Sequence, residues 1–235
     1  GMGGTVAGTR HAKDGVFVIL DASTLELLHE GRDSRHWLRC AAWAPDASVF
    51  ALGSTDHKIY IYDARSTDLL AKCAKHNAAV ARLDFSADSQ YVQSDAVDYE
   101  HLYHAARDGA HVRLPSQLKD AQWHAWTCVY GWPVQGCWPS LAGDAKEERR
   151  DARADVTTTH RSPDETLLVA GDDRGDLRLL RYPAAQGQLA IKCAHSHVSA
   201  VAAAQFTCDG NHFISVGKRD RTVVVWRLQR ALNNK

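Results

Sequence analysis

A unit of turns and short strands that repeats along the chain restricts its fold more than any other feature. Each copy opens with a polar turn that contains an aspartate, and these aspartates are Asp46, Asp88, Asp164 and Asp209. They follow one another at about 42, 76 and 45 residues, so that only the middle interval departs from a period of about 40–45 residues. Four short strands per unit at this period are typical of the blades of a β-propeller. The repeat therefore predicts an all-β fold.

A second turn lies inside each unit. In GKRDRTVVVW (217–226) and GSTDHKIYIYD (53–63), a glycine and an aspartate three residues later precede a strand of β-branched and aromatic residues. SDAVDYEHLYH (94–104) repeats the pattern, and GDDRGDLRLLRY (171–182) is a degenerate copy with Arg174 at the aspartate position. The turn acid is expected to accept hydrogen bonds from nearby backbone N–H groups.

The strand pattern predicts one propeller domain over residues 1–235 with about five blades. Their approximate bounds are 5–29, 37–73, 80–113, 155–193 and 200–228, with the first and last blades incomplete. Residues 114–154 explain the long interval, as an insertion of a Trp-rich hairpin and a polar loop. A blade cannot bury both of its faces alone, so an isolated fragment of this kind is expected to self-associate.

Composition narrows the classes of function. Lys+Arg and Asp+Glu are 28 each, and this balance disfavours nucleic acid or a membrane surface as a partner. The six cysteines form no C-x-x-C pair, which disfavours a zinc ribbon or a redox motif. We therefore expect reduced, packed cysteines, no cofactor and no bound metal.

The repeats resemble those of WD-repeat propellers, which often bury a histidine, a Ser/Thr, an aspartate and a tryptophan in each blade. The resemblance implies such a structural tetrad in the last blade, with a partial one in an earlier blade. The residues that match are His195, Ser215, Asp220 and Trp226 in the last blade, and His76, Ser94 and Asp98 in the earlier one. His104 stands at the tryptophan position of the earlier blade.

Three segments resemble the echinoderm-microtubule-associated-protein-like family more closely. They are SDAVDYEHLYH, VAGDDRGDLRLLRYP and AQWHAWTCVYGWPVQGCWP, of which the last (121–139) is the specific one. The resemblance covers nearly the whole chain and matches the C-terminal part of the family's tandem propeller region. Because that family's second propeller has seven blades, it implies that this chain is a fragment of a seven-bladed ring.

The resemblance implies a non-catalytic scaffold that binds tubulin or other partners at microtubules, in the cytoplasm and cytoskeleton. One alternative is a general WD-repeat adaptor with other partners, for instance in a cilium or flagellum. A hydrolase or metalloenzyme built on the propeller is a third. It would need acids or histidines that converge on one point, and the sequence offers no such set.

Two sets of residues invite a chemical interpretation. His76, Ser94 and Asp98 have the residue types of a catalytic triad, but they also fit an internal hydrogen-bond chain, which we favour. The closely spaced histidines in HSH (195–197) and HLYH (101–104) suggest metal ligation, yet no acid or cysteine completes a set at suitable spacing. We therefore predict no catalytic and no metal-binding residue.

Two surfaces are candidates for partner binding. Basic residues at two turns could meet an acidic partner such as a tubulin tail, although ordinary solvated turn charge explains them too. These residues are Arg174, Lys218, Arg219 and Arg221. In the Trp-rich segment, Trp126 and Trp132 could form an aromatic contact surface, and the alternative is that the segment is buried on its blade.

Overall fold

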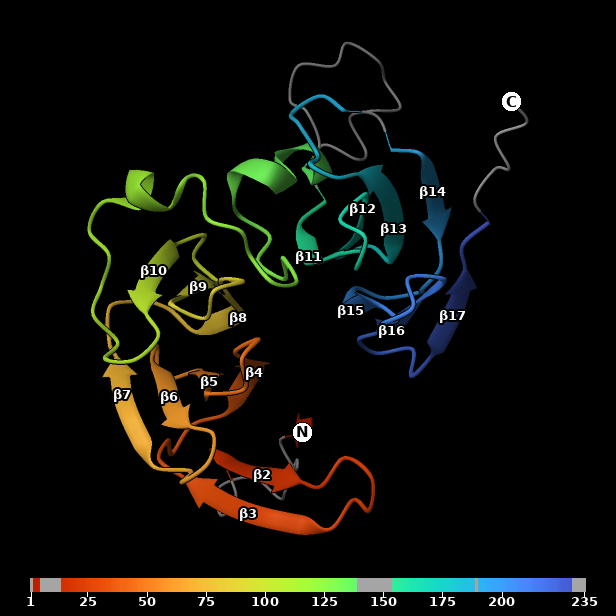
Figure 1. Ribbon diagram of the computed structural model, residues 1–235. Coiled ribbons are helices and arrows are strands. Elements are labelled where there is room, and N and C mark those ends of the chain that lie inside the picture. Colours follow the sequence, from red (N-terminus) through yellow and green to blue (C-terminus); the bar gives the residue numbers. More distant parts are fainter. Residues whose placement is uncertain (1, 5–13, 139–153, 189, 230–235) are drawn as a thin grey trace. The chain divides into compact units, whose positions relative to one another are not determined.

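The computed structural model describes residues 2–4, 14–138, 154–188 and 190–229. In these ranges the chain forms five antiparallel β-sheets (Figure 1), which confirms the predicted all-β class. The sheets fall into two compact units, residues 1–124 and 125–235. No helix in the described ranges has the length and apolar character that a membrane span requires.

Three sheets make up the first unit. The first contains β1 (Met2–Gly4), β2 (Val16–Leu20) and β3 (Leu27–Arg32). The second contains β4 (Leu38–Trp43), β5 (Val49–Ser54), β6 (Ile59–Asp63) and β7 (Leu69–Cys73). The third contains β8 (Val80–Phe85), β9 (Tyr91–Ala96) and β10 (His101–Ala105), and is followed by the 3₁₀ helix η1 (Pro115–Leu118).

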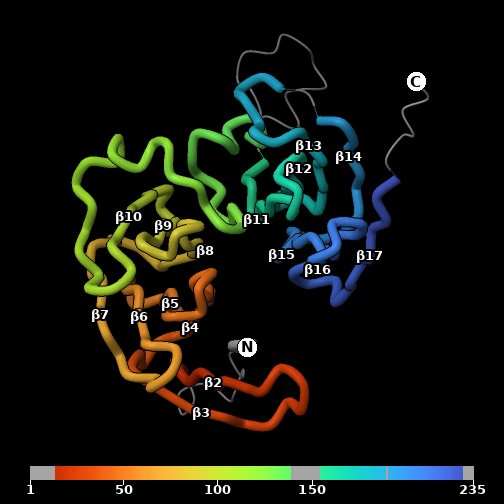
Figure 2. The backbone as a smooth tube through the Cα atoms, in the orientation of Figure 1, coloured from red at the N-terminus to blue at the C-terminus, as the bar shows by residue number. Residues whose placement is uncertain are grey.

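The second unit begins with a 3₁₀ helix and continues with two sheets. The helix is η2 (Trp132–Cys137). The four-stranded sheet contains β11 (Val156–Arg161), β12 (Leu167–Asp172), β13 (Asp176–Arg181) and β14 (Lys192–His195). The last sheet contains β15 (Val201–Phe206), β16 (His212–Gly217) and β17 (Val223–Arg227). Within this unit the paired strands are antiparallel, and Figure 2 traces the chain through them.

Strand β6 illustrates how the sequence builds a sheet that is covered on both faces. Its alternating residues place Ile59 and Ile61 on one face and Tyr60 and Tyr62 on the other. The isoleucines pack with Val80 and other residues of the next sheet, and the tyrosines pack with residues of the preceding one. All four side chains are buried. Burial on both faces explains why the sequence of β6 is a continuous run of aliphatic and aromatic residues rather than an alternation of apolar and polar ones.

The sheets share one register feature that aligns them. The first strand of each sheet after the first has a bulge directly after its first paired residue. These residues are Leu38, Val80, Val156 and Val201. They therefore occupy equivalent positions, and other positions of the repeat can be counted from them.

The turn between the first two strands of these sheets is also repeated. Its aspartate accepts a hydrogen bond from the backbone N–H two residues later, at 2.9–3.3 Å. The residue after the aspartate has a positive φ: Ala47 (56°), Ser89 (60°), Glu165 (58°) and Gly210 (65°). The hydrogen bonds that Asp209 accepts, the largest contribution being from the Thr207 hydroxyl, lower its pKa to about 2. The four aspartates therefore mark the same turn in four sheets, as the spacing in the sequence predicted.

Parts of the expected strand layout differ from the structure. A fourth strand expected before residue 113 is only an isolated bridge between His104 and His111. The prediction of a Trp-rich hairpin was wrong, because the 3₁₀ helix η2 lies there instead. Pro133, at the start of η2, has no N–H to donate to a neighbouring strand, which disfavours a hairpin at this point. The start of the first expected blade (5–29) and most of the polar loop lie outside the described residues. All six cysteines are described, and each is a free thiol.

Candidate functional site

A buried hydrogen-bond network ties the last sheet together around His197. Its Nε2 is 2.8 Å from Ser215 Oγ, and its Nδ1 is 2.8 Å from Thr222 Oγ1 and 3.2 Å from Asp220 Oδ2. The Trp226 indole N–H donates to Ser215 Oγ at 2.9 Å. An ionised carboxylate only accepts hydrogen bonds, so the histidine Nδ1 donates toward Asp220, while Ser215 accepts from the Trp226 indole. The network links the loop before β15 to both β16 and β17.

The histidine of this tetrad is His197, and the prediction of His195 was wrong. The side chain of His195 is largely exposed at the end of β14, where its Nδ1 is 2.7 Å from Asp176 Oδ1. The spacing along the chain distinguishes the two histidines. His197 precedes Val201 by four residues, just as His76 precedes Val80, and these two valines are equivalent.

The β8–β10 sheet contains a related network with a different acid. His76 Nε2 is 2.7 Å from Ser94 Oγ, and His76 Nδ1 is 3.0 Å from Glu100 Oε2. Asp98, the predicted acid, instead accepts the backbone N–H of Glu100 at 3.4 Å. Burial lowers the pKa of His76, although the neighbouring Glu100 acts to raise it. The prediction that Asp98 bonds the histidine was therefore wrong, because the longer glutamate side chain reaches it.

His104 occupies the register position of Trp226 in this sheet and behaves differently. Counted from the bulge, His104 pairs with Val92 as Trp226 pairs with Phe213. Its side chain is fully buried, and neither ring nitrogen has a hydrogen-bond partner among the described residues. Burial lowers the pKa of His104 to about 4. No indole is therefore present at this position to donate to Ser94.

The arrangement of Ser94, His76 and Glu100 has the bonding order of a catalytic triad, but its burial argues against nucleophilic chemistry. A nucleophilic serine must reach a substrate, whereas Ser94 is 0% exposed and His76 is also buried. Ser215 is equally buried in the last sheet. Both sets are thus placed to hold strands together.

The two histidines of each closely spaced pair do not converge on one point. His195 bonds Asp176, whereas His197 bonds the buried serine of the next sheet. In the other pair, His101 bonds Asp95, while the ring of His104 faces those of His76 and His111 at centroid distances of 6.5 and 5.4 Å. Each pair is divided between two separate sets of contacts.

The predicted basic residues border a groove in the second unit. The groove has a volume of about 630 Å³. It is lined by Asp173, Val198, Ser199, Ala200, Lys218, Arg219 and Asp220. Lys218 and Arg219 are exposed in it, and Arg174 and Arg221 are exposed directly beside lining residues in the sequence. Val198, which the sequence analysis did not single out, is 90% exposed at the same place.

Hydrogen bonds hold the two walls of this groove in place. The Lys218 N–H donates to the Ala200 carbonyl at 2.8 Å, and the Arg219 N–H donates to Ser199 Oγ at 2.9 Å. The Val198 N–H donates to Asp220 Oδ2 at 3.1 Å, next to the buried His197. The groove is therefore preorganised by the same network that ties the last sheet together.

The two tryptophans predicted as partner contacts have opposite environments. Trp126 is 4% exposed, lies against Gly131, and faces the ring of Tyr182 at 6.5 Å. It cannot contact a partner, so that prediction was wrong. Trp132, in contrast, is 81% exposed at the start of η2.

Helix η2 presents Trp132 from a fixed position. The Gly136 N–H donates to the Ala184 carbonyl, and the Ala184 N–H donates to the Pro133 carbonyl, both at 2.8 Å. A Cβ at Gly136 would lie only 2.2 Å from the carbonyl oxygen of Ala185, so this close approach requires glycine. Arg178, which the sequence analysis missed, donates to the Cys137 carbonyl at 3.0 Å and to Asp172 at 3.1 Å.

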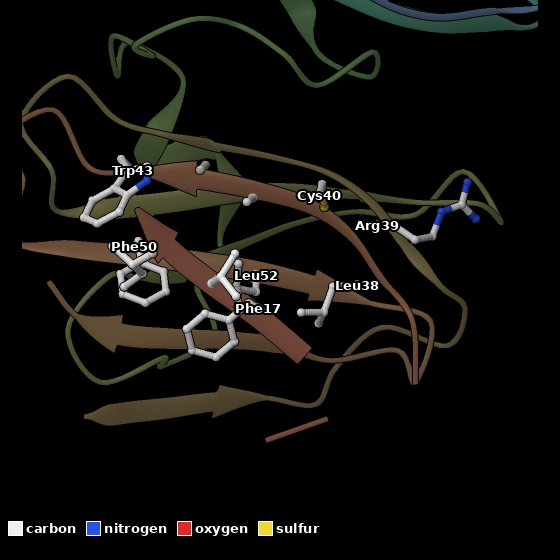
Figure 3. A pocket seen from close by; sticks show the side chains of 11 residues that line it. Phe17, Leu38, Arg39, Cys40, Trp43, Phe50 and Leu52 are labelled. Atoms are coloured by element: carbon white, nitrogen blue, oxygen red, sulfur yellow. The ribbon is translucent and has the colours of Figure 1, made fainter. Parts of the chain in front are cut away.

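A pocket of about 250 Å³ lies between β2 and β4 in the first unit. Figure 3 shows Phe17, Leu38, Trp43 and Leu52 around it, with the guanidinium of Arg39 pointing away. Burial raises the pKa of the Cys40 thiol in its lining to about 12. Since a thiol is nucleophilic only as the thiolate, the pocket offers apolar contact rather than reactivity.

A family model described as the second β-propeller of echinoderm microtubule-associated protein matches residues 4–228. The 77 kDa echinoderm microtubule-associated protein of Strongylocentrotus purpuratus is 33% identical over 216 residues, covering 90% of this chain and 30% of that protein. Echinoderm microtubule-associated protein-like 1 of Mus musculus is 31% identical, covering 91% of this chain and 26% of that protein. This chain thus spans less than a third of the length of these relatives.

A solved structure described as "Crystal Structure of Mitotic Checkpoint Complex" contains a chain of similar fold. The TM-score is 0.53 at 17% sequence identity, with 92% of this chain and 57% of that chain covered. At this level of identity the similarity concerns the fold alone.

Proposed function

Since this chain belongs to the echinoderm microtubule-associated protein family, in its second β-propeller, we propose that it is a non-catalytic scaffold that binds tubulin in microtubules. Its place would be the cytoplasm and the cytoskeleton. The names of the relatives support the association with microtubules. Because the chain spans only part of those proteins, the activity of the whole relatives does not transfer to it directly.

The observation that carries the proposal is the groove beside Lys218 and Arg219. Two exposed cations lie next to the exposed apolar side chain of Val198, on loops that hydrogen bonds already fix. A fixed surface loses little conformational entropy on binding. Cations at the rim attract an acidic partner and raise the association rate. An acidic, extended tubulin tail with an occasional apolar residue fits this chemistry.

The buried histidine–serine pairs support the non-catalytic part of the proposal. They have the bonding that could activate a nucleophile, yet each serine is enclosed by its own sheet. Their bonds connect strands and fix the groove loops, so their contribution to function is indirect.

An adaptor for proteins other than tubulin is the second candidate, and Trp132 favours it. Tryptophan is enriched among residues that dominate protein interfaces. Here Trp132 is 81% exposed on η2, which a hydrogen bond from Arg178 to the Cys137 carbonyl attaches to β13. If Trp132 carries the contact, partner selection depends on an apolar pocket in the partner rather than on charge.

Co-pelleting of the purified chain with microtubules tests the proposal. We expect binding that weakens about tenfold in the K218E/R219E variant, and weakens with added salt because exposed charges are screened. The matched control is R65E/R113E, which reverses two exposed arginines of the first unit and should bind normally. Microtubules whose acidic tails were removed by proteolysis should also bind less.

The results separate the two candidates. Failure of the wild-type chain to pellet with microtubules would contradict tubulin binding. Binding that survives K218E/R219E and is lost in Trp132→Ala would assign the contact to η2 instead of the groove.

A further inference from the structure

The groove beside Lys218 and Arg219 contains one exposed apolar side chain whose identity the fold does not explain. Val198 is 90% exposed in the loop before β15. A single exposed apolar residue is ordinary on a protein surface. Val198, however, lines a groove of about 630 Å³ together with two exposed cations, between two sheets of the same unit. Its side chain is therefore available to a ligand in the groove.

The equivalent position in the β8–β10 sheet shows what the fold itself requires here. Asn77 and Val198 each directly follow the histidine of the buried network in their sheet. The Asn77 N–H donates to Glu100 Oε2 at 3.2 Å, just as the Val198 N–H donates to Asp220 Oδ2 at 3.1 Å. Both sheets thus use the backbone of this position in the same way.

The side chains at this position differ although the backbones agree. The Asn77 side-chain amide donates to Glu100 Oε1 at 3.2 Å, so asparagine contributes a bond to its own sheet. A valine side chain forms no hydrogen bond, and Val198 is too exposed to add much to the packing of its sheet. Stability therefore gives no reason for a valine in this loop, whereas binding in the groove does.

Three hydrogen bonds join the loop before β15 to the β16–β17 turn and fix the order of the groups along the groove. The bonded pairs are Ala200 with Lys218, Ser199 with Arg219, and Val198 with Asp220. The two cations are thus neighbours on one loop, and the apolar side chain lies near them on the other. An extended peptide advances about 3.3 Å per residue. A side chain that contacts Val198 therefore lies within a few residues of carboxylates that meet the cations.

The carboxylates that line the groove restrict its ligand without making it repel every acidic one. Asp220 is already engaged, since it accepts the Val198 N–H and lies 3.2 Å from His197 Nδ1. Asp173, on the neighbouring sheet, accepts the Asp155 N–H at 3.0 Å but is exposed. It disfavours further carboxylates on its side of the groove. A segment with carboxylates near the cations alone therefore fits better than a uniformly acidic one.

We propose that the groove binds an acidic peptide segment through one apolar side chain seated on Val198, with carboxylates of the same segment on Lys218 and Arg219. Val198 then determines specificity, because it distinguishes such a segment from a purely acidic one. Apolar burial stabilises the bound state, whereas exposed charges mainly raise the association rate. This inference rests on the proposed function, in that it takes the groove as the binding site for an acidic partner.

Fluorescence anisotropy with two labelled peptides tests the proposal. Both peptides are short runs of glutamate, with leucine at the central position of one and serine in its place in the other. The wild-type chain should bind the leucine peptide about tenfold more tightly, which corresponds to the lower end of the free energy of burying a leucine side chain. Added salt should weaken the binding of both peptides, because their glutamates are the same.

Substitutions separate the two parts of the site. Val198→Ser should bind the leucine peptide no more tightly than the serine peptide, while the loop keeps the backbone N–H that donates to Asp220. K218E/R219E should bind both peptides about tenfold more weakly. Val97→Ser, which changes a half-exposed valine of the first unit, is the matched control and should keep the full preference for leucine. Equal thermal unfolding of all variants checks that they fold.

Three results would overturn the proposal. They are equal affinity of the wild-type chain for the two peptides, an undiminished preference for leucine in Val198→Ser, and binding of neither peptide. Since neither peptide is tubulin, the proposed function is tested separately. A leucine preference that depends on Val198, without pelleting on microtubules, would refute tubulin as the partner and support this inference. Pelleting on microtubules without such a preference would refute this inference alone.

Discussion

The β15–β17 and β8–β10 sheets share a histidine–serine pair and differ most at the position of the third strand that faces the serine. In the last sheet, Trp226 donates its indole N–H to Ser215 at 2.9 Å. In the other sheet, the same register position holds His104, whose two ring nitrogens are buried without a partner among the described residues. In the last sheet the third strand thus contributes a hydrogen bond to the network, whereas in the β8–β10 sheet its histidine makes no hydrogen bond among the described residues.

This difference shows where polar networks stabilise a sheet and where they do not. A buried, unsatisfied polar group costs about 1–3 kcal/mol, while a satisfied hydrogen bond contributes about 1 kcal/mol. Packing of Phe85, Val92 and their neighbours must therefore offset the cost of His104. Substitutions of His197, His104 and Trp226 test this difference between the two sheets.

The largest effect is expected from His197→Ala. The substitution removes one partner each from Ser215, Thr222 and Asp220 and leaves a cavity, so the free energy of unfolding should fall by about 3 kcal/mol. Urea denaturation measures it. The control is His195→Ala, which removes an exposed pair with Asp176 and should change stability by less than about 0.5 kcal/mol. Similar losses in both variants would refute the assignment of His197 to the tetrad.

Acidification should destabilise the β8–β10 sheet through His104. Burial, followed by the charges of His111, His76 and Lys75, lowers the pKa of His104 from 6.5 to about 4. The unfolded chain therefore binds this proton more readily than the folded chain, so stability that is full above pH 6.5 is lost as pH falls toward 4. By linkage the loss reaches about 3 kcal/mol over this range.

His104→Phe isolates this contribution, because every other titrating group remains. We expect the variant to be about 1 kcal/mol more stable than wild type at pH 7, since no buried nitrogen is left unsatisfied. Its stability should also fall less between pH 7 and pH 4.5, as measured by urea denaturation. Parallel pH profiles for the two proteins would mean that His104 is not the acid-sensitive group.

The smallest effect is expected from Trp226→Phe. Phenylalanine keeps the stacking on Phe213, whose ring lies 5.6 Å away, but cannot donate to Ser215. We expect urea denaturation to show a loss of about 1 kcal/mol in the free energy of unfolding, because one partly buried hydrogen bond disappears. An unchanged stability would indicate that stacking alone explains why tryptophan is there.

Features that depend on local sequence could be predicted. The four turn aspartates define the repeat because each bonds a backbone N–H only two residues away. Strands β6 and β17 could be predicted because both are rich in β-branched and aromatic residues. Such features require no knowledge of what lies across the sheet.

Features that depend on contacts across the fold could not be predicted with the same accuracy. His195 and His197 are two residues apart, and only the register of the first strand, which makes Val201 equivalent to Val80, shows which one enters the network. Trp126 and Trp132 lie six residues apart in the same Trp-rich segment, but Trp126 packs against Gly131 and is buried, whereas Trp132 is exposed. Similarly, the longer side chain of Glu100, rather than that of Asp98, reaches the imidazole of His76.

The aspartate turns have a consequence for how copies of this repeat diverge. Each turn satisfies its own polar groups within a few neighbouring residues, so a substitution deeper in the sheet leaves it intact. Changes in a cross-strand network can therefore leave the turns intact, as in the β8–β10 sheet, where His104 stands at the tryptophan position but the Asp88 turn keeps its hydrogen bonds. The turn aspartates thus mark a repeat even where its signature side chains differ.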